Sequence, residues 1–344
     1  MHIALICPFS TGPIRGNITT VNRIADHLPT TGCRVTVLSK DRWTSGELQE
    51  RISLIRPDLL HGFHAFHSGQ LTRQLAEAAG IPYLITITGS DLFDPAMNSA
   101  PETMQALGAA ANITCFDPLV ARCVKDCFSV EAGRLSIIPQ GVTRPSKGEP
   151  FLKTENEFAI LLPAALRPVK GIIQAMDALL PLAVEFPFLR LLLAGGALDA
   201  DYTASIRKRA TTLPWVHLLG EVPYQRMGSL YDAADLVLNS SLFEGGMANS
   251  LLEAMSVGRP VLARDIPGNR SLIRHNKTGW LYQSDHELRE LARMLLCNPE
   301  RGSVIGEAGR AFVQKHCSPS REARRYFSLY ERIIKALLLL RYTQ

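Results

Sequence analysis

The sequence predicts an α/β protein in which two Rossmann-like, doubly wound parallel-sheet domains face a cleft. Three observations predict this fold: a length of 344 residues, a repeated alternation of apolar strands with helical patterns, and one interruption of that alternation near the middle. A single hydrophobic core seldom grows beyond about 250 to 300 residues. The two halves of the chain are therefore expected to form separate cores.

The first half contains six short apolar runs separated by helical patterns. The runs cover residues 2–8, 34–39, 59–64, 83–89, 112–116 and 135–139. Continuous apolar strands that alternate with helices are typical of a parallel sheet covered by helices on both faces. We expect them to form an N-terminal domain over residues 1–145, completed by the C-terminal helix of residues 322–344.

A linker follows, and the alternation then starts again. Residues 140–150 are rich in Gly, Pro and polar side chains and lack periodicity, which predicts a hinge. Six further apolar runs cover residues 158–165, 189–194, 216–220, 236–240, 260–264 and 279–282. They predict a second doubly wound domain over residues 146–321.

The composition is that of a globular protein and argues against several other classes. Apolar residues make up 46% of the chain and charged residues 20%. The net charge of +5 is spread along the chain, so no nucleic-acid partner is expected. The start of the chain lacks a basic leader, and the seven cysteines are scattered, which together predict a cytoplasmic protein with reduced thiols.

The longest apolar stretch, residues 333–340, is too short to cross a bilayer. Lys335 and Arg341 flank its leucines. Two interpretations fit this pattern: an amphipathic helix on a membrane surface, and a helix packed on the protein's own core. We expect at most peripheral membrane contact.

Unusual residues concentrate at the ends of the predicted strands. In open parallel sheets, ligands bind beyond the carboxyl ends of the strands. The segments at those ends are residues 16–17, 61–67, 88–91, 167–171, 195–196 and 244–253. We expect the functional site among them.

The strongest of these segments joins a buried strand to a helix through a glycine-containing loop. Asn249 or Ser250 is expected to cap the helix, whose amide-rich start would attract phosphate or sugar hydroxyls. Glu244 in the loop and Glu253 inside the helix suit a ligand with two polyol parts. The alternative is that Glu244 only complements the helix dipole and that Glu253 is solvated.

At this point the chain resembles the retaining glycosyltransferases of the two-Rossmann-domain (GT-B) class, in particular glycosyltransferase family 4. The resemblance is carried by the runs LLGEVP at 218–223, LYDAAD at 230–235, EAMSVGRPVLA at 253–263 and ARDIPGN at 263–269. In detail and in length the chain looks like the group called glycosyltransferase 1 domain-containing proteins. The resemblance implies that residues 146–321 hold a nucleotide sugar and that residues 1–145 hold the acceptor.

The resemblance also implies that the two glutamates, Glu244 and Glu253, bind the donor. In the family they usually lie eight positions apart, whereas here 253 − 244 = 9. Because glycines tolerate unusual backbone angles, the loop can accommodate the additional residue, and Glu244 stays a predicted contact of the donor sugar. The expected donor-binding residues in this segment are Glu244, Gly245, Gly246, Met247, Ala248, Asn249 and Glu253.

Arg167 and Lys170 resemble the family's basic pair that binds the donor diphosphate. Fixed cations stabilise the charge that a departing diphosphate accumulates, so no metal ion is expected. The alternative is a solvated basic pair beside a helix start. Val222 is expected near the nucleotide base, where backbone atoms would make the contacts.

In the first half, Arg15, Gly16 and Asn17 precede a helical pattern over residues 18–28. We expect Gly16 to approach the donor and Asn17 the acceptor. The pattern G-x-G-x-x-G does not follow the first strand, which argues against a nicotinamide or flavin enzyme.

Three histidines, His61, His64 and His67, lie where the family places a histidine that contacts the reacting sugar. His64 matches that position best and joins Glu244, Arg167 and Lys170 as a predicted catalytic residue. Asp91 resembles the family's Gly-Thr/Ser-Asp turn, where it would either orient the acceptor or cap the following helix.

By resemblance, the chain is a metal-independent, retaining glycosyltransferase of hexosyl- or N-acetylhexosaminyl-transferase type. It would use a nucleotide diphosphate sugar, with UDP favoured, and an unidentified acceptor, and it would need no cofactor. Two alternatives stay open: a catalytically silent nucleotide-sugar-binding protein, and a nucleotide-sugar epimerase on the same fold.

Overall fold

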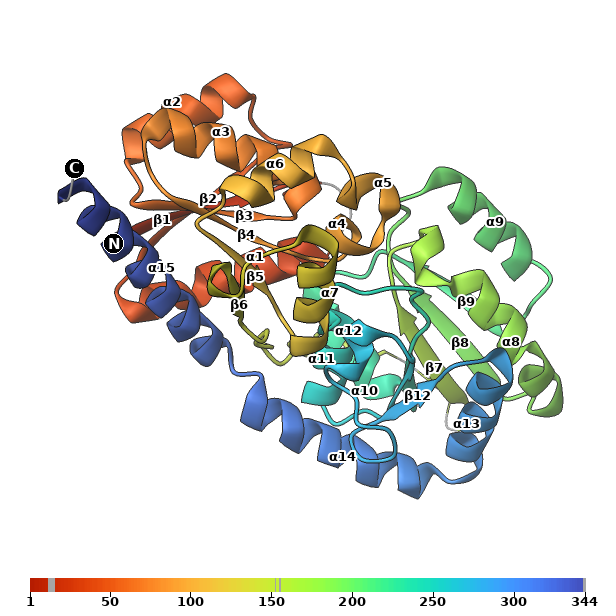
Figure 1. The fold of residues 1–344 in the computed structure, drawn as a ribbon. Helices are drawn as coiled ribbons and strands as arrows, with labels where there is room; N and C mark the ends of the chain where they lie inside the picture. The colour runs from red at the N-terminus through yellow and green to blue at the C-terminus, as the bar shows by residue number, and fades with distance from the viewer. Residues whose placement is uncertain (12–15, 152, 155, 343–344) are drawn as a thin grey trace.

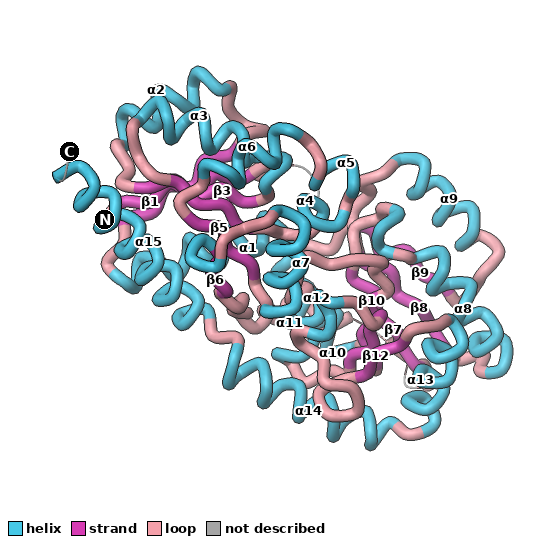
Figure 2. Tube along the Cα trace, in the orientation of Figure 1, coloured by secondary structure: helices cyan, strands magenta, loops and turns pink. Residues whose placement is uncertain are grey.

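The computed structural model describes residues 1–11, 16–151, 153–154 and 156–342. It contains two parallel six-stranded sheets, ordered β2-β1-β3-β4-β5-β6 and β12-β11-β10-β7-β8-β9, each flanked by helices (Figures 1 and 2). The predicted fold class, two doubly wound domains, is confirmed. Within the described residues, no helix is long and apolar enough to cross a membrane.

The strands lie where the apolar runs predict them, to within a few residues at the ends. Those of the first sheet are β1 His2–Cys7, β2 Arg34–Ser39, β3 Leu59–Phe63, β4 Tyr83–Thr86, β5 Asn112–Cys115 and β6 Leu135–Ile137. Those of the second are β7 Phe158–Pro163, β8 Leu189–Ala194, β9 Val216–Gly220, β10 Leu236–Asn239, β11 Val261–Arg264 and β12 Trp280–Tyr282. Central strands are buried on both faces, which explains their continuous apolar sequence.

The helices connect successive strands, and several short ones line the space between the domains. The first domain contains α1 Gly16–His27, α2 Ser45–Ile55, α3 Gln70–Ala79, α4 Ser90–Phe93, α5 Pro95–Asn98, α6 Pro101–Ala109 and α7 Pro118–Phe128. The second contains α8 Ile172–Glu185, α9 Ala200–Ala210, α10 Tyr224–Ala233, α11 Asn249–Ser256, α12 Pro267–Arg270, α13 Asp285–Cys297 and α14 Pro299–His316. The last helix is α15 Pro319–Tyr342.

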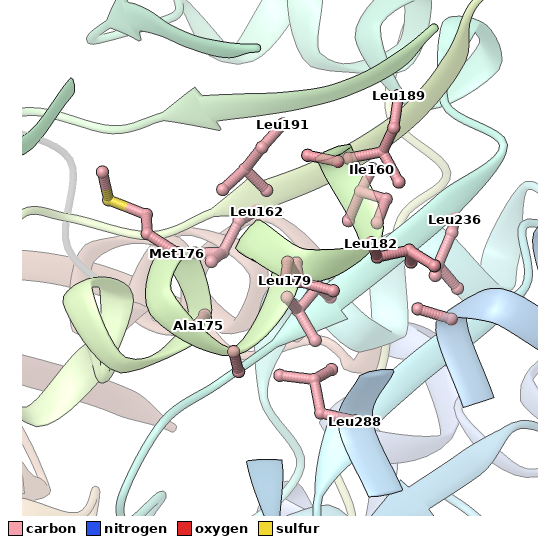
Figure 3. Packing of buried hydrophobic residues seen from close by; sticks show 14 of the residues in the cluster. Ile160, Leu162, Ala175, Met176, Leu179, Leu182, Leu189, Leu191, Leu236 and Leu288 are labelled. Carbon is pink, nitrogen blue, oxygen red and sulfur yellow. The ribbon is translucent and has the colours of Figure 1, made fainter. Parts of the chain in front are cut away.

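The core of the second domain holds the strands that carry the candidate site. Apolar side chains of α8, among them Met176, Leu179 and Leu182, pack on Ile160 of β7 and Leu191 of β8 (Figure 3). Such burial is the main source of domain stability, at roughly 25 cal/mol for each Å² of apolar surface removed from water. The carboxyl end of β7 is thereby fixed against its neighbours, β8 and β10.

The chain crosses back to the first domain through α15 (Figure 1). Tyr326, Tyr330 and Ile333 of this helix belong to the same buried cluster as Ile24 and Leu28 of the first domain. The C-terminal helix therefore packs on the first domain, in agreement with the second of the two interpretations of its apolar stretch. Residues 343 and 344 of the predicted range lie outside the described part of the chain.

Candidate active site

A cleft of about 280 Å³ opens between the two domains at the carboxyl ends of their strands. Thirteen of the predicted site residues line it: Gly16, Asn17, His64, Arg167, Lys170, Val222, Glu244, Gly245, Gly246, Met247, Ala248, Asn249 and Glu253. The structure thus gathers residues that are up to 237 positions apart in the chain, since 253 − 16 = 237. Asp91 is fully buried beside the cleft and is described below.

Lys170 and Glu244 form a close ion pair on the second-domain wall of this cleft. The Lys170 Nζ atom lies 2.5 Å from Glu244 Oε1, and the Ser241 hydroxyl donates to the same oxygen at 2.7 Å. Burial alone would raise the pKa of Glu244, but Lys170, Ser241 and Arg167 outweigh it and lower that pKa. Glu244 is therefore held as a carboxylate.

The position of Lys170 depends on the glycine that follows it. Lys170 ends a single 3₁₀ turn, Pro168–Lys170, after β7, and Gly171 continues the chain with φ +58°. A Cβ atom on Gly171 would lie 2.5 Å from the Ser240 carbonyl oxygen at the end of β10. Only glycine fits this close approach, which brings the basic turn against the loop that carries Glu244.

The start of α11 faces the cleft without a side-chain cap. The N-cap residue is Ala248, and the prediction that Asn249 or Ser250 caps the helix is wrong. The Asn249 amide is engaged elsewhere: it donates to the Gly16 carbonyl at 3.1 Å and accepts from Arg23 at 3.2 Å. The helix start therefore keeps its anion-binding character, because its first amides are not taken up by a cap.

Glu253 lies one turn further along α11, deep in the cleft. It is 7% exposed, and its Oε2 atom accepts a 2.8 Å hydrogen bond from the Tyr231 hydroxyl. Burial raises the pKa of Glu253 to about 7, although Tyr231 and Arg23 act in the opposite direction. A buried carboxyl group that titrates near neutrality is typical of a functional site.

His64 lies on the first-domain wall, in a backbone conformation that is rare for a side chain with a Cβ atom. Its φ is +76°, and a π-helical turn, Ala65–Gly69, follows it. Both features cluster at functional sites in proteins. The His67 amide donates to His64 Nδ1 at 3.2 Å, so the proton of the neutral ring is on Nε2, which donates to the Ser90 hydroxyl at 2.8 Å.

The electrostatic environment of His64 favours its neutral form. Burial is the main cause that lowers its pKa, and Arg167 adds to it, while Asp91 works against both. His67 lies beside His64 in the cleft, with ring centroids 4.2 Å apart. His61 points the other way, into the first-domain core, where it contacts Tyr330 and Thr86.

The Asp91 carboxylate organises the ends of two strands. It accepts hydrogen bonds from the backbone amides of Ala65 at 2.8 Å, Gly89 at 2.7 Å and Thr88 at 3.1 Å. Asp91 is completely buried, so these contacts use the carboxylate within the protein. Asp91 does not cap the following helix, α4, whose N-cap residue is Gly89, and its role toward the acceptor stays a prediction. Its carboxylate instead orders the turns that carry His64 and Thr88.

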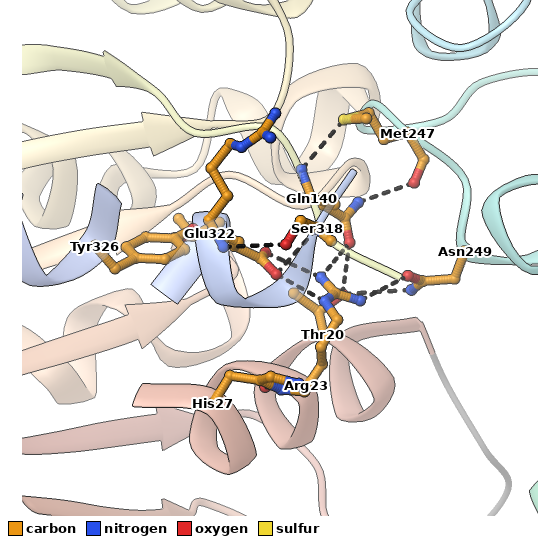
Figure 4. Close-up of polar contacts among 12 residues, drawn as sticks. Thr20, Arg23, His27, Gln140, Met247, Asn249, Ser318, Glu322 and Tyr326 are labelled. Atoms are coloured by element: carbon orange, nitrogen blue, oxygen red, sulfur yellow. Dashed lines mark hydrogen bonds and ion pairs between the residues drawn. The ribbon is translucent and has the colours of Figure 1, made fainter. Parts of the chain in front are cut away.

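Buried polar contacts join the two domains on one side of the cleft (Figure 4). The Arg23 guanidinium of α1 forms an ion pair with Glu322 of α15 at 2.8 Å and donates to Gln140 of the linker at 2.8 Å. Gln140 in turn donates to the Met247 carbonyl at 2.9 Å. The predicted hinge therefore contacts both the last helix and the loop before α11. Arg15, named beside Gly16 and Asn17, lies outside the described residues.

Several residues that line the cleft were not singled out from the sequence. Phe9, Gln140, Tyr224, Tyr231 and Phe243 belong to this group. The four aromatic residues are hard to identify from the sequence, because an aromatic side chain in a loop or helix usually belongs to the hydrophobic core. Among the residues that the structure describes, no group of three or more His, Cys, Asp or Glu side chains is arranged to hold a metal ion.

Comparisons with known proteins show similarity to glycosyltransferases in sequence and in fold. The sequence model of the family "Glycosyl transferases group 1" matches residues 157–298. Glycosyltransferase 1 domain-containing protein 1 of Xenopus tropicalis is 28% identical over 335 residues, which is 91% of this chain and 93% of that protein. The Escherichia coli UDP-Gal:alpha-D-GlcNAc-diphosphoundecaprenol alpha-1,3-galactosyltransferase is 25% identical over 82% of this chain and 76% of its own length.

Solved structures share the fold across nearly the whole chain. The sucrose-phosphate synthase from Thermosynechococcus elongatus superposes with a TM-score of 0.81 at 18% identity, covering 97% of this chain and 99% of that one. Anabaena Alr3699/HepE, solved in complex with UDP-glucose, gives a TM-score of 0.72 at 17% identity and covers 98% and 99% of the two chains.

Proposed function

We propose that this chain, a group 1 glycosyltransferase with the GT-B fold, transfers a sugar from a UDP-sugar to an acceptor with retention at the anomeric carbon and without a metal ion. One observation carries the proposal: Lys170, Glu244, the uncapped start of α11 and Glu253 all line one cleft. A cation, an amide-rich helix end and two carboxylates match a ligand that has a diphosphate between two polyol groups.

The diphosphate would lie between the basic turn and the helix start. Arg167 and Lys170 approach from the second-domain wall, and the first amides of α11 face the same space. As the bond from the anomeric carbon to phosphate breaks, negative charge builds up on the departing UDP. Fixed cations and amides stabilise that charge more than the ground state, which is why no metal ion is needed.

The two glutamates would hold the two ends of the donor. Glu253 is the deeper of the two and suits the ribose hydroxyls, while Glu244 lies beside Lys170 and suits the transferred sugar. Glu244 lines the cleft despite the additional residue between them, and the loop contains two residues with positive φ, Gly246 at +107° and Met247 at +32°. This placement supports an active enzyme over a silent binder.

We favour UDP as the nucleotide because two similar proteins are named or solved with UDP-sugars. The Escherichia coli protein is named for a UDP-galactose donor, and the Anabaena protein was solved with UDP-glucose. The acceptor would enter from the first-domain wall at Asn17 and His64. Attack on the same face that UDP leaves gives retention, with the acceptor proton passing to the departing phosphate oxygen.

Release of UDP from a panel of UDP-sugars tests this function, with and without EDTA. We expect release from at least one hexose or N-acetylhexosamine donor, no effect of EDTA, and an α-configured product by NMR from an α-linked donor. A sample that binds UDP but releases none from any UDP-sugar would contradict the proposal, as would an inverted product.

A further inference from the structure

We propose that α15 and the free edge of β6 form a surface that docks on anionic membrane lipids. This inference is independent of the chemistry in the cleft, and among the described residues none lines both places. It starts from a second groove of about 420 Å³, whose walls are α15 on one side and Ser136 and Ile137 of β6 on the other. Within the described part of the chain, β6 is an edge strand that pairs with β5 alone, so its outer side is open.

Four arginines line this groove: Arg321, Arg324, Arg325 and Arg332. All four are exposed. Arg321 donates to the Lys315 carbonyl and Arg332 to the Ser136 hydroxyl at 3.3 Å, and both of these acceptors are neutral. No carboxylate is among the described residues that line the groove. The uncompensated charge favours an anionic partner.

The same face of α15 continues to the exposed Leu339, and the exposed Leu338 lies about 100° further round the helix. Arg321 and Leu339 are 18 positions apart (339 − 321), which is about five whole helical turns and places them on one line along the helix. Leu339 is 68% exposed and Leu338 46% exposed, and Ile137 on the β6 wall is 42% exposed. The carboxylate of Glu331 on this helix lies 3.9 Å from Lys335, so these two charges offset each other.

Basic residues beside exposed leucines fit a lipid surface better than a soluble anion. Arginine side chains attract anionic headgroups, with about a fivefold gain in partition for each charge near the surface, and apolar side chains add affinity when they enter the acyl boundary. A free phosphate would use the arginines but would give no role to Leu338 and Leu339. The opposite face of α15, with Tyr326 and Tyr330, is buried on the first domain, so the helix stays folded while it docks.

Co-sedimentation of the whole protein with vesicles tests this surface. We compare phosphatidylcholine vesicles with vesicles in which about one third of the lipid is phosphatidylserine, at low and high salt. Binding is expected only with phosphatidylserine and is expected to weaken with salt. The double variant R324Q/R325Q should bind about 30-fold more weakly, since two charges at about fivefold each are lost.

The control is R207Q/K208Q, which removes an equal charge from an exposed basic pair on α9 and should bind like the unaltered protein. L338Q/L339Q keeps the charges and should also bind more weakly. Thermal unfolding and UDP release are measured for each variant, so that a failure to fold is separated from a loss of docking. Unchanged binding by R324Q/R325Q would overturn the proposal, and so would displacement by inorganic phosphate at constant ionic strength, which would assign the groove to a free anion.

Discussion

Gly89 and Gly245 bring the two domains into backbone contact across the cleft. Gly89 follows β4 of the first domain, and Gly245 follows β10 of the second. A Cβ atom on Gly245 would lie 2.4 Å from the Gly89 nitrogen and 2.2 Å from the Thr88 carbonyl. The absence of side chains at this point therefore allows the donor wall and the His64 wall to approach each other.

Replacing Gly245 with alanine should hold the domains apart. The donor-binding residues lie mainly on the second domain, so we expect UDP affinity to change little, while kcat falls by about 100-fold because a displacement near 1 Å is enough to misplace reacting groups. Titration with UDP measures the affinity, and steady-state kinetics measures kcat. The control G108A alters a helical position where a Cβ atom meets nothing within 4 Å, and it should be fully active. Equal kcat for both variants would contradict the role assigned to Gly245.

Replacing Lys170 with methionine removes the cation beside Glu244 and the departing phosphate. We expect kcat to fall by about 100-fold to 1,000-fold, as for the loss of one group that stabilises developing charge. The pKa of Glu244 should rise at the same time, because burial would no longer be opposed by the adjacent ammonium group. The activity of K170R, which keeps the charge, is the matched comparison. If K170M and the unaltered protein have the same kcat, Lys170 does not serve the diphosphate.

Glu253 makes stability depend on pH. Its pKa is about 7 in the folded protein and 4.5 when unperturbed, so the folded state binds the proton more tightly. The stability linked to this group is therefore fully present below about pH 4.5, is lost as pH rises toward 7, and stays lost above it. We expect E253Q to exceed the unaltered protein by about 3 kcal/mol in unfolding free energy at pH 8 and to come close to it near pH 4.5. Urea unfolding at several pH values measures this difference, and a difference independent of pH would contradict the assignment. E253Q should also bind UDP more weakly than the unaltered protein, because groups that serve function often reduce stability.

Arg23 and Glu322 form a buried pair whose members depend on each other. Replacing Arg23 with methionine leaves the Glu322 carboxylate buried without its cation, which should cost about 3 to 5 kcal/mol of unfolding free energy. Replacing both residues with methionine should cost less than the single change. In either variant the Asn249 side chain loses the hydrogen bond that it accepts from Arg23, so KM for the UDP-sugar should rise. Chemical denaturation measures the unfolding free energies of the single and double variants. A double variant that is less stable than R23M would contradict the predicted order of stability.

The strands and the donor wall were predictable because their signals are local. β7 and β10 are continuous apolar runs since helices cover both faces of the sheet, and the segment from Glu244 to Glu253 follows directly from the end of β10. The parallel order of the strands then places this segment beside Arg167 and Lys170.

The contacts between distant segments could not be predicted in the same way. Asn249 has the residue type of a helix cap, yet its amide is taken by Gly16 and Arg23, which approach from another domain. The Tyr231 hydroxyl reaches Glu253 from a neighbouring helix, and no pattern in the sequence joins the two positions. The π turn after His64 is likewise set by the Asp91 carboxylate, 26 positions further on. Each case depends on tertiary packing, which overrides local preference.

Calorimetric titration with UDP tests most directly whether the cleft is a nucleotide-sugar site. We expect the unaltered protein to bind UDP, GDP and ADP to bind more weakly, and K170M and E253Q each to lose at least about tenfold in UDP affinity, equivalent to about 1.4 kcal/mol. Absence of UDP binding, a preference for GDP or ADP, or equal UDP affinity in all three proteins would contradict it.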